Sequence, residues 1–194
     1  MTNTHTTREA WLTEAIEMLA PFFIERTGIE EMPKVRVSVG WPGGSGRKNS
    51  VIGQCWAPGA AADGVAQVFI SPVLADAGRV LDVLVHELIH AIDENQSGHR
   101  GRFRKMALAM GLEGKMTATV AGDELKQDLA VIAAMLGEYP HAALKHSDAK
   151  KQSTRMLNVE CAEGSGYKAR MTRKWLEEYG APKCPCHDET MAIG

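Results

Sequence analysis

The pattern of apolar positions at the start of the chain changes from a helical to an alternating period. Apolar side chains recur at steps of four, three and four at Leu12, Ile16, Leu19 and Phe23. This spacing predicts a helix over residues 8–26, and Pro21 is expected to kink or split it. Residues 34–39, 51–56 and 65–70 then read as short strands, divided by glycine- and proline-containing turns. Together they predict a small antiparallel or mixed sheet.

The pattern returns to helix after residue 72. An apolar stripe from Leu81 to Ile92 predicts a buried helix that ends before Gly98. Two more helical faces follow at 103–110 and 125–136. The polar, lysine-rich stretch 141–154 reads as a linker. We therefore expect an α+β domain over residues 1–144, followed by a linker and a small β module over residues 145–194.

Composition and charge narrow the class of protein. With 194 residues, 44% hydrophobic and 24% charged, the chain is neither collagen-like, nor a coiled-coil rod, nor wholly disordered. No apolar run reaches the roughly 20 residues of a membrane span. The first residues lack a secretory pattern, and four cysteines are too few for a disulfide scaffold. These features predict a cytoplasmic protein that makes no use of a membrane.

A metal-binding motif lies inside the apolar helix. His86 and His90 are four residues apart, so both imidazoles lie on one helical face and can bind the same Zn²⁺. Glu87 lies beside them, where it can take a proton from the attacking water and pass it to the leaving nitrogen of a scissile bond. The HExxH sequence therefore predicts a catalytic zinc with Glu87 as general base and acid.

A catalytic zinc normally has three protein ligands, so a third must come from elsewhere. The metzincin pattern requires glycine at position 93 and histidine at position 96, where this chain has Asp93 and Gln96. Two sources remain open. One is His99, which follows a glycine where the chain can turn back, and we favour it. The other is a downstream carboxylate, for which the candidates are Glu113, Asp123 and Glu124.

The run from His86 to Ala91, followed by Gly98-His99 and Phe103, resembles the SprT-like family of zinc metalloproteases. Upstream, residues 51–56 and 66–74 look like the sheet of that family. The resemblance implies a zincin-like fold, zinc ligands His86, His90 and His99, and Glu87 as the catalytic residue. It also implies a protease acting on proteins or peptides, in some relatives on proteins associated with or crosslinked to DNA.

Residues near the C-terminus look like the zinc ribbon of the same family. Cys161 is followed three residues later by Gly164 rather than by the second cysteine of a CxxC pair, so that half of the ribbon is degenerate. Four side chains are candidates for a second, structural zinc, namely Cys161, Cys184, Cys186 and His187. Of these, Cys184 and His187 have the better spacing, because neighbouring Cys186 and His187 would be strained as joint ligands.

Cations and aromatic rings occur together in the C-terminal module. Residues 145–183 carry 9 Lys and Arg against 5 Asp and Glu, although the whole chain has a formal charge of −2. Tyr167 and Trp175 are interleaved with this charge, as in proteins that bind single strands. The candidate nucleic-acid contacts are Lys168, Arg170, Arg173 and Lys174.

We expect a zinc-dependent metalloendopeptidase. Residues 65–70 could form an edge strand to which a substrate adds as an extra strand. Cys55 is interpreted as a small apolar side chain rather than a nucleophile. Two other functions stay open: a DNA-binding or adaptor protein with a structural or vestigial metal site, and a hydrolase of non-peptide amides.

Overall fold

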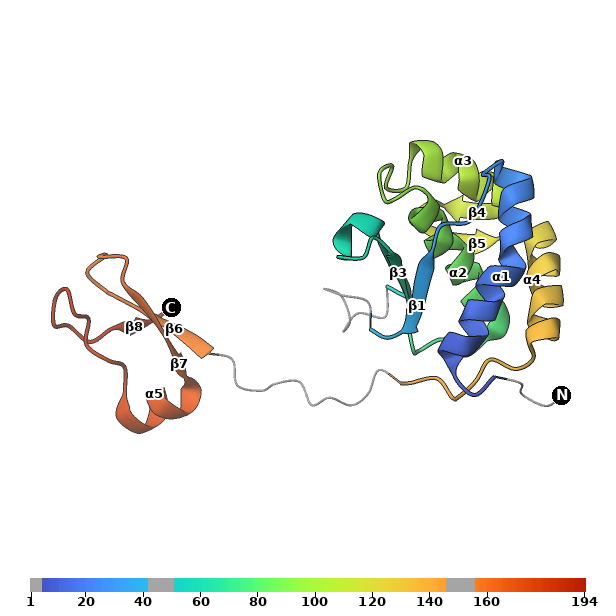
Figure 1. Cartoon of the computed structure of the whole chain (residues 1–194). Helices are drawn as coiled ribbons and strands as arrows, with labels where there is room; N and C mark the ends of the chain where they lie inside the picture. The colour runs from blue at the N-terminus through green and yellow to red at the C-terminus, as the bar shows by residue number, and fades with distance from the viewer. Residues whose placement is uncertain (1–4, 42–50, 146–155) are drawn as a thin grey trace. The chain divides into compact units, whose positions relative to one another are not determined.

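A computed structural model describes residues 5–41, 51–145 and 156–194 of the chain. It divides into two compact units, residues 1–146 and residues 147–194. The boundary lies two residues after the predicted one, which followed residue 144. The first unit contains the longer helices and two small sheets, and the second contains three short strands and one helix (Figure 1). The chain is therefore α+β. The glycine-rich stretch before residue 51 and most of the expected linker lie outside the described residues.

The first unit is built on a three-stranded mixed sheet. Its strands are β1 (Val35–Val39), β2 (Gly53–Trp56) and β3 (Ala66–Ile70), in the order β1-β3-β2. β3 pairs parallel with β1 and antiparallel with β2. One face of β3 is fully buried, through Ala66, Val68 and Ile70, and packs against the helices. The 3-10 turn η1 (Pro58–Ala60) connects β2 to β3.

This strand order corrects one expectation. The segment over residues 65–70 does not form an edge strand, because β3 lies in the centre of the sheet and is paired on both sides. Among the described strands, the edge strand that lies against the helix over residues 77–92 is β2. Sequence patterns give the buried face of a strand, but they do not give the order of strands in a sheet.

The first helix, α1 (Arg8–Thr27), continues through Pro21 without a break. Pro21 and Glu17, four residues earlier, both lie on the exposed side of the helix. The Glu17 carbonyl that loses its helical partner to proline therefore faces solvent, where water can replace the bond. The buried side carries Trp11, Leu12 and Phe23, which belong to the main core. Proline is tolerated here because the hydrogen bond that it removes lies on the solvent-exposed side of the helix.

Three further helices complete the first unit: α2 (Ala77–Ile92), α3 (Gly101–Met110) and α4 (Asp123–Leu136). Gly111 ends α3 in the left-handed conformation, with φ 89°, as expected for a helix C-cap. Between α3 and α4 lies a hairpin of β4 (Leu112–Lys115) and β5 (Ala118–Ala121), which the sequence pattern did not predict. Leu112 and Ala121 turn one side of this hairpin into the core.

The second unit is a sheet of β7 (Lys168–Thr172), β6 (Met156–Glu160) and β8 (Ala192–Ile193), in that order, and all its pairs are antiparallel. Helix α5 (Arg173–Tyr179) follows β7 directly and was not expected in a β module. The core of this unit is small and consists of Val159, Cys161, Leu176, Cys184 and Met191.

None of the helices in the described parts of the chain is both long and apolar enough to cross a membrane.

Arg8 joins the two ends of the first unit. Its guanidinium is buried and donates hydrogen bonds to the carbonyls of Pro140, Pro72 and His141, at 2.8, 3.1 and 3.2 Å. It also lies over the ring of Tyr139, 4.7 Å from its centre. One side chain thus satisfies three backbone groups from distant segments.

Replacing this side chain should therefore destabilise the first unit. We expect Arg8→Ala to lower the free energy of unfolding by about 3 kcal/mol, because buried acceptors lose a charged donor. Urea denaturation followed by circular dichroism measures the effect. The matched control is Arg36→Ala, since Arg36 is an exposed arginine paired with Asp63, and it should leave the midpoint almost unchanged. Equal effects of the two substitutions would contradict this role of Arg8.

Candidate metal centre

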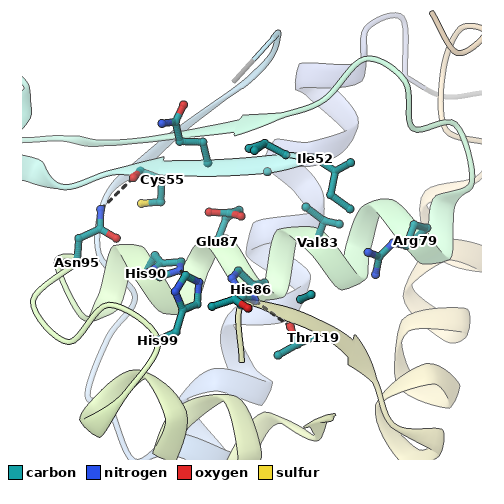
Figure 2. A pocket seen from close by; sticks show the side chains of 15 residues that line it. Ile52, Cys55, Arg79, Val83, His86, Glu87, His90, Asn95, His99 and Thr119 are labelled. Carbon is teal, nitrogen blue, oxygen red and sulfur yellow. Dashed lines mark hydrogen bonds between the residues drawn. The ribbon is translucent and has the colours of Figure 1, made fainter. Parts of the chain in front are cut away.

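Helix α2 places the first two histidines and the glutamate of the motif. It starts at Asp76, whose carboxylate accepts the backbone N–H of Arg79 at 2.7 Å, and it is buried along most of its length. His86 and His90 lie one turn apart on the same side, with Glu87 next to them (Figure 2). The motif therefore sits on a rigid, buried helix, which fixes the direction of each side chain.

The third histidine comes from the loop between α2 and α3. Asp93, almost fully buried, accepts the backbone N–H of Ser97 at 2.7 Å and its hydroxyl at 2.9 Å. Glu94 and Asn95 adopt left-handed φ angles of 52° and 58°, which turns the chain sharply after the helix. These contacts bring His99 back over the helix face that carries the other two histidines.

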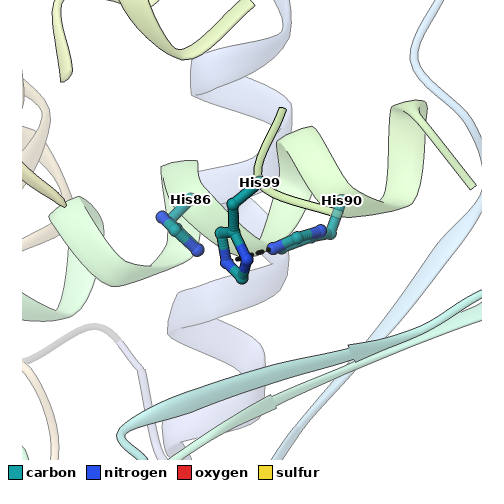
Figure 3. Close-up of side chains that lie close together, drawn as sticks. All are labelled: His86, His90 and His99. Carbon is teal, nitrogen blue, oxygen red and sulfur yellow. Dashed lines mark hydrogen bonds between the residues drawn. The ribbon is translucent and has the colours of Figure 1, made fainter. Parts of the chain in front are cut away.

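The three imidazoles converge on one point (Figure 3). Their candidate ligand atoms all lie within 4.8 Å of one another, and Nε2 of His90 is 3.2 Å from Nε2 of His99. Two imidazole ligands of a tetrahedral zinc, each at 2.0–2.1 Å, place their nitrogens about 3.3 Å apart. His90 and His99 therefore have the spacing of two ligands of one metal ion, and His86 lies close enough to be a third.

The protonation of these histidines also suits a metal site. Burial, and to a smaller extent the neighbouring imidazoles, lowers the pKa of His86 to about 3 and that of His90 to about 4. Burial also lowers the pKa of His99. All three rings are consequently neutral near pH 7, which is the form that binds metal.

Two neighbours hold the imidazoles in place. The fully buried ring of Phe103 packs against all three, with ring centres 4.3 to 5.0 Å away. Nδ1 of His86 is 2.8 Å from the hydroxyl of Thr119 on β5. With the proton on Nδ1, the ring donates to Thr119 and its Nε2 lone pair is left for a metal. Sequence reasoning missed Thr119, because it lies in the unpredicted hairpin.

Glu87 is held in an almost completely buried position against strand β2. Burial raises the pKa of Glu87 to about 8. A Cβ atom on Gly53 of β2 would collide with the Glu87 carboxylate and come within 2.7 Å of Val83. Only glycine at position 53 therefore allows the strand to approach the helix this closely. The glutamate lies between the edge strand and the histidines (Figure 2).

These groups share one open cleft of about 370 Å³. It lies between β2 and β5, with the motif helix as its floor (Figure 2). Cys55 lines it, half-buried, and burial together with the charge of Glu87 raises the pKa of its thiol to about 12. Cys55 therefore remains a protonated thiol at neutral pH, which agrees with its interpretation as a small apolar side chain rather than a nucleophile.

The alternative carboxylate ligands lie elsewhere. Glu113 is exposed and packs over Gly122, Asp123 pairs with Lys126, and Glu124 lies near Arg26. None of the three belongs to the group around His86. Among the described residues, the third member of this group is His99.

A second group forms in the C-terminal unit from Cys161, Cys184 and His187. Sγ of Cys161 is 3.3 Å from Nδ1 of His187. A turn in which the carbonyl of Cys184 accepts the N–H groups of residues 187 and 188 brings Cys184 and His187 to the same side. The fourth candidate, Cys186, is exposed and lies outside this group.

The ionisation of Cys161 favours a metal, whereas the raised pKa of His187 retains a proton that a metal would have to displace. Hydrogen bonds from Ser165, and then from Cys184 and His187, lower the pKa of Cys161 to about 6, while the two thiols raise that of His187. A thiolate is the form of cysteine that binds metal. Cys161, which begins a turn closed by a hydrogen bond from the N–H of Gly164 to its carbonyl, thus presents an ionised sulfur donor near neutral pH.

The four candidate nucleic-acid contacts are exposed on one strand and the start of one helix. Lys168 pairs with Glu160 at 3.0 Å, and Arg173 lies 3.8 Å from Glu177. The ammonium of Lys174 lies 5.3 Å from the ring centre of Trp175. Arg170 is exposed on β7. Part of the positive charge is therefore neutralised within the unit.

Comparison of the chain with protein-family models, with curated proteins and with solved structures finds no match. The function must therefore be inferred from the geometry of the two groups.

The contact between Thr119 and His86 predicts a measurable effect on metal affinity. We expect Thr119→Val to weaken Zn²⁺ binding about tenfold, because His86 loses the partner that fixes its tautomer and ring orientation. Thr119→Ser keeps the hydroxyl and should bind nearly as tightly as the wild type. Competition with a coloured chelator measures both. Equal affinity of the valine and serine variants would show that the hydroxyl has no such role.

The second group predicts a difference between two cysteines of the same unit. Cys161→Ser should remove one metal ion per chain, because it replaces a thiolate ligand with a weak one. Cys186→Ser should keep the full metal content, because Cys186 lies outside the group. Elemental analysis of the purified proteins measures the ratio. Loss of metal from the Cys186 variant would instead make that cysteine a ligand.

Proposed function

We propose that this chain is a zinc-dependent metalloendopeptidase with a zincin-like fold, as its resemblance to the SprT-like family implies. The observation that carries the proposal is the position of Glu87 beside three converging imidazoles in a cleft whose wall is an edge strand. Neutral imidazoles suit zinc among the transition metals. Zinc also fits the second group, because its donors are two sulfurs and an imidazole nitrogen.

The residues of the cleft have two different roles in the proposed hydrolysis, metal binding and proton transfer. His86, His90 and His99 would hold a zinc ion, which lowers the pKa of a water molecule and polarises the scissile carbonyl. Glu87 takes the proton from the attacking water as the new C–O bond forms. It then delivers this proton to the leaving nitrogen as the C–N bond breaks. Burial raises the proton affinity of Glu87 above that of a solvated carboxylate, which suits a group that takes up and then releases a proton.

Strand β2 offers a way to hold a peptide. Its neighbour on one side is β3, and its other edge faces the cleft. An extended substrate can pair with the backbone of this edge, so that main-chain hydrogen bonds supply affinity with little dependence on sequence. This geometry favours a peptide over a small amide, which has no backbone to pair along the strand.

The C-terminal unit supports a role in choosing the substrate. Its exposed Trp175 and Tyr179 have ring centres 5.3 Å apart, and Lys174 lies over the first ring. Exposed rings beside cations are typical of surfaces that stack nucleic-acid bases. We therefore propose DNA or DNA-bound protein as a partner. The rival function is an adaptor in which this unit acts and the metal site is vestigial.

The Glu87→Gln substitution separates the enzyme from the adaptor. It should lower the hydrolysis of casein and of DNA-bound protein at least 1,000-fold, because the amide cannot accept the proton, and it should leave the zinc content unchanged. The matched control is Glu113→Gln, which changes an exposed glutamate outside the cleft and should keep full activity. Product formation by mass spectrometry and zinc by elemental analysis provide the readouts.

The other outcomes point to other functions. If Glu87→Gln keeps the biological effect of the chain, the protein acts as an adaptor. If the wild type cleaves small amides but no protein or peptide, it is an amide hydrolase of another class. Activity that persists after zinc removal would exclude the proposed mechanism.

A further inference from the structure

We propose that the cleft contains a carboxylate-binding subsite at Arg79, so that a substrate is held by an acidic group about three residues from the scissile bond. This inference rests on the proposed peptidase function and adds a specificity to it. The carboxylate can be an Asp or Glu side chain or the C-terminus of the substrate, because both present the same two oxygens to a guanidinium.

One end of the edge strand is already occupied. The side-chain amide of Asn95 donates a hydrogen bond to the carbonyl of Cys55 at 2.9 Å. Asn95 belongs to the loop that carries His99, and Figure 2 shows this contact at one end of the cleft. A substrate strand cannot take the same carbonyl without displacing Asn95. Pairing therefore has to extend from the histidines in the other direction along β2.

The backbone groups available in that direction follow from the pairing of β2 with β3. The Ile52 carbonyl accepts the N–H of Ser71 and so points toward β3. Backbone groups of alternate residues point to opposite edges of a strand, so those of Gly53 point into the cleft. A peptide that pairs antiparallel with β2 runs from its N-terminal side near the histidines to its C-terminal side near residue 51.

Arg79 lies at the far end of this path (Figure 2). It precedes His86 by seven residues on α2, which corresponds to about 10 Å along the helix axis. An extended peptide covers this distance in about three residues. An acidic group two or three residues beyond the scissile bond on the C-terminal side therefore reaches the guanidinium.

The guanidinium is held in place and still has donors available. Nη1 of Arg79 binds the buried carboxylate of Asp82, which fixes the side chain, while about a third of the Arg79 side chain stays exposed. Lys126 lines the same surface hollow as Asp82 and Arg79. The carboxylate of Asp82 therefore faces two cations, Arg79 and Lys126. Arginine has five N–H donors in a planar fork, and one bond to Asp82 leaves a bidentate edge for a ligand.

The test uses short peptides and the full-length, zinc-loaded chain. Nonapeptides of alanine and serine carry a single Glu, or Gln as the neutral match, at successive positions, with either a free or an amidated C-terminus. Cleavage by the wild type gives kcat/KM and the cleaved bond. Binding to the Glu87→Gln variant, measured by calorimetry, gives Kd without hydrolysis.

We expect the wild type to prefer Glu over Gln about tenfold in kcat/KM when the residue lies two or three positions after the cleaved bond. Arg79→Gln should reduce this ratio to about one without loss of zinc. The double change Arg79→Gln with Asp82→Asn should do the same without leaving an unpaired carboxylate. Arg102→Gln, on another surface, should keep the preference. A preference that requires a free C-terminus identifies the terminal carboxylate as the ligand.

Two results would overturn the subsite. One is equal kcat/KM for Glu and Gln peptides in the wild type together with equal Kd in the Glu87→Gln variant. The other is a Glu preference that survives both Arg79 variants. The binding measurement tests the subsite independently of the proposed peptidase function. If the wild type cleaves no peptide but Kd still depends on Glu and on Arg79, the subsite stands and the peptidase function falls.

Discussion

The burial of polar side chains on helix α2 is the constraint on which the candidate site depends. A helix in the centre of a core normally carries apolar side chains on its buried faces, yet α2 buries Glu87 and His90 among Leu84, Leu88 and Ile89. Placing such groups away from water is costly unless they have partners. Convergence of three neutral imidazoles gives their nitrogens a common partner when a metal is bound. The packing of the surrounding apolar core offsets the free-energy cost of burying these polar side chains.

The same constraint explains which parts of the site the sequence predicts. The apolar stripe of α2 and the four-residue spacing of His86 and His90 are local features, so the helix and its metal-binding face could be read directly. His99 was the favoured third ligand because a glycine precedes it, and the loop does return it to the helix. These residues are close in sequence, and short-range geometry determines how they meet.

Contacts between distant segments could not be read in this way. Thr119 meets His86 across 33 positions, from a hairpin whose strands are only four residues long and mostly exposed. The identity of the edge strand depends on which strands pair, and the alternation of residues 65–70 gives no information on that point. The closeness of β2 to Glu87 depends on Gly53, which in the sequence is one glycine among 19.

The two candidate metal-binding groups differ in how far the folding of their unit would depend on a bound metal. The histidines of the first unit are surrounded by a large core that is complete without them, so a metal bound there would add little to folding. The C-terminal unit buries five core side chains, and two of these are the cysteines of the second group. A core this small supplies too little apolar burial to hold a fold alone, and proteins of this size commonly use a metal as the crosslink. The two turns that present Cys161 and Cys184 would therefore depend on the ion that joins them, whereas α2 depends only on its packing.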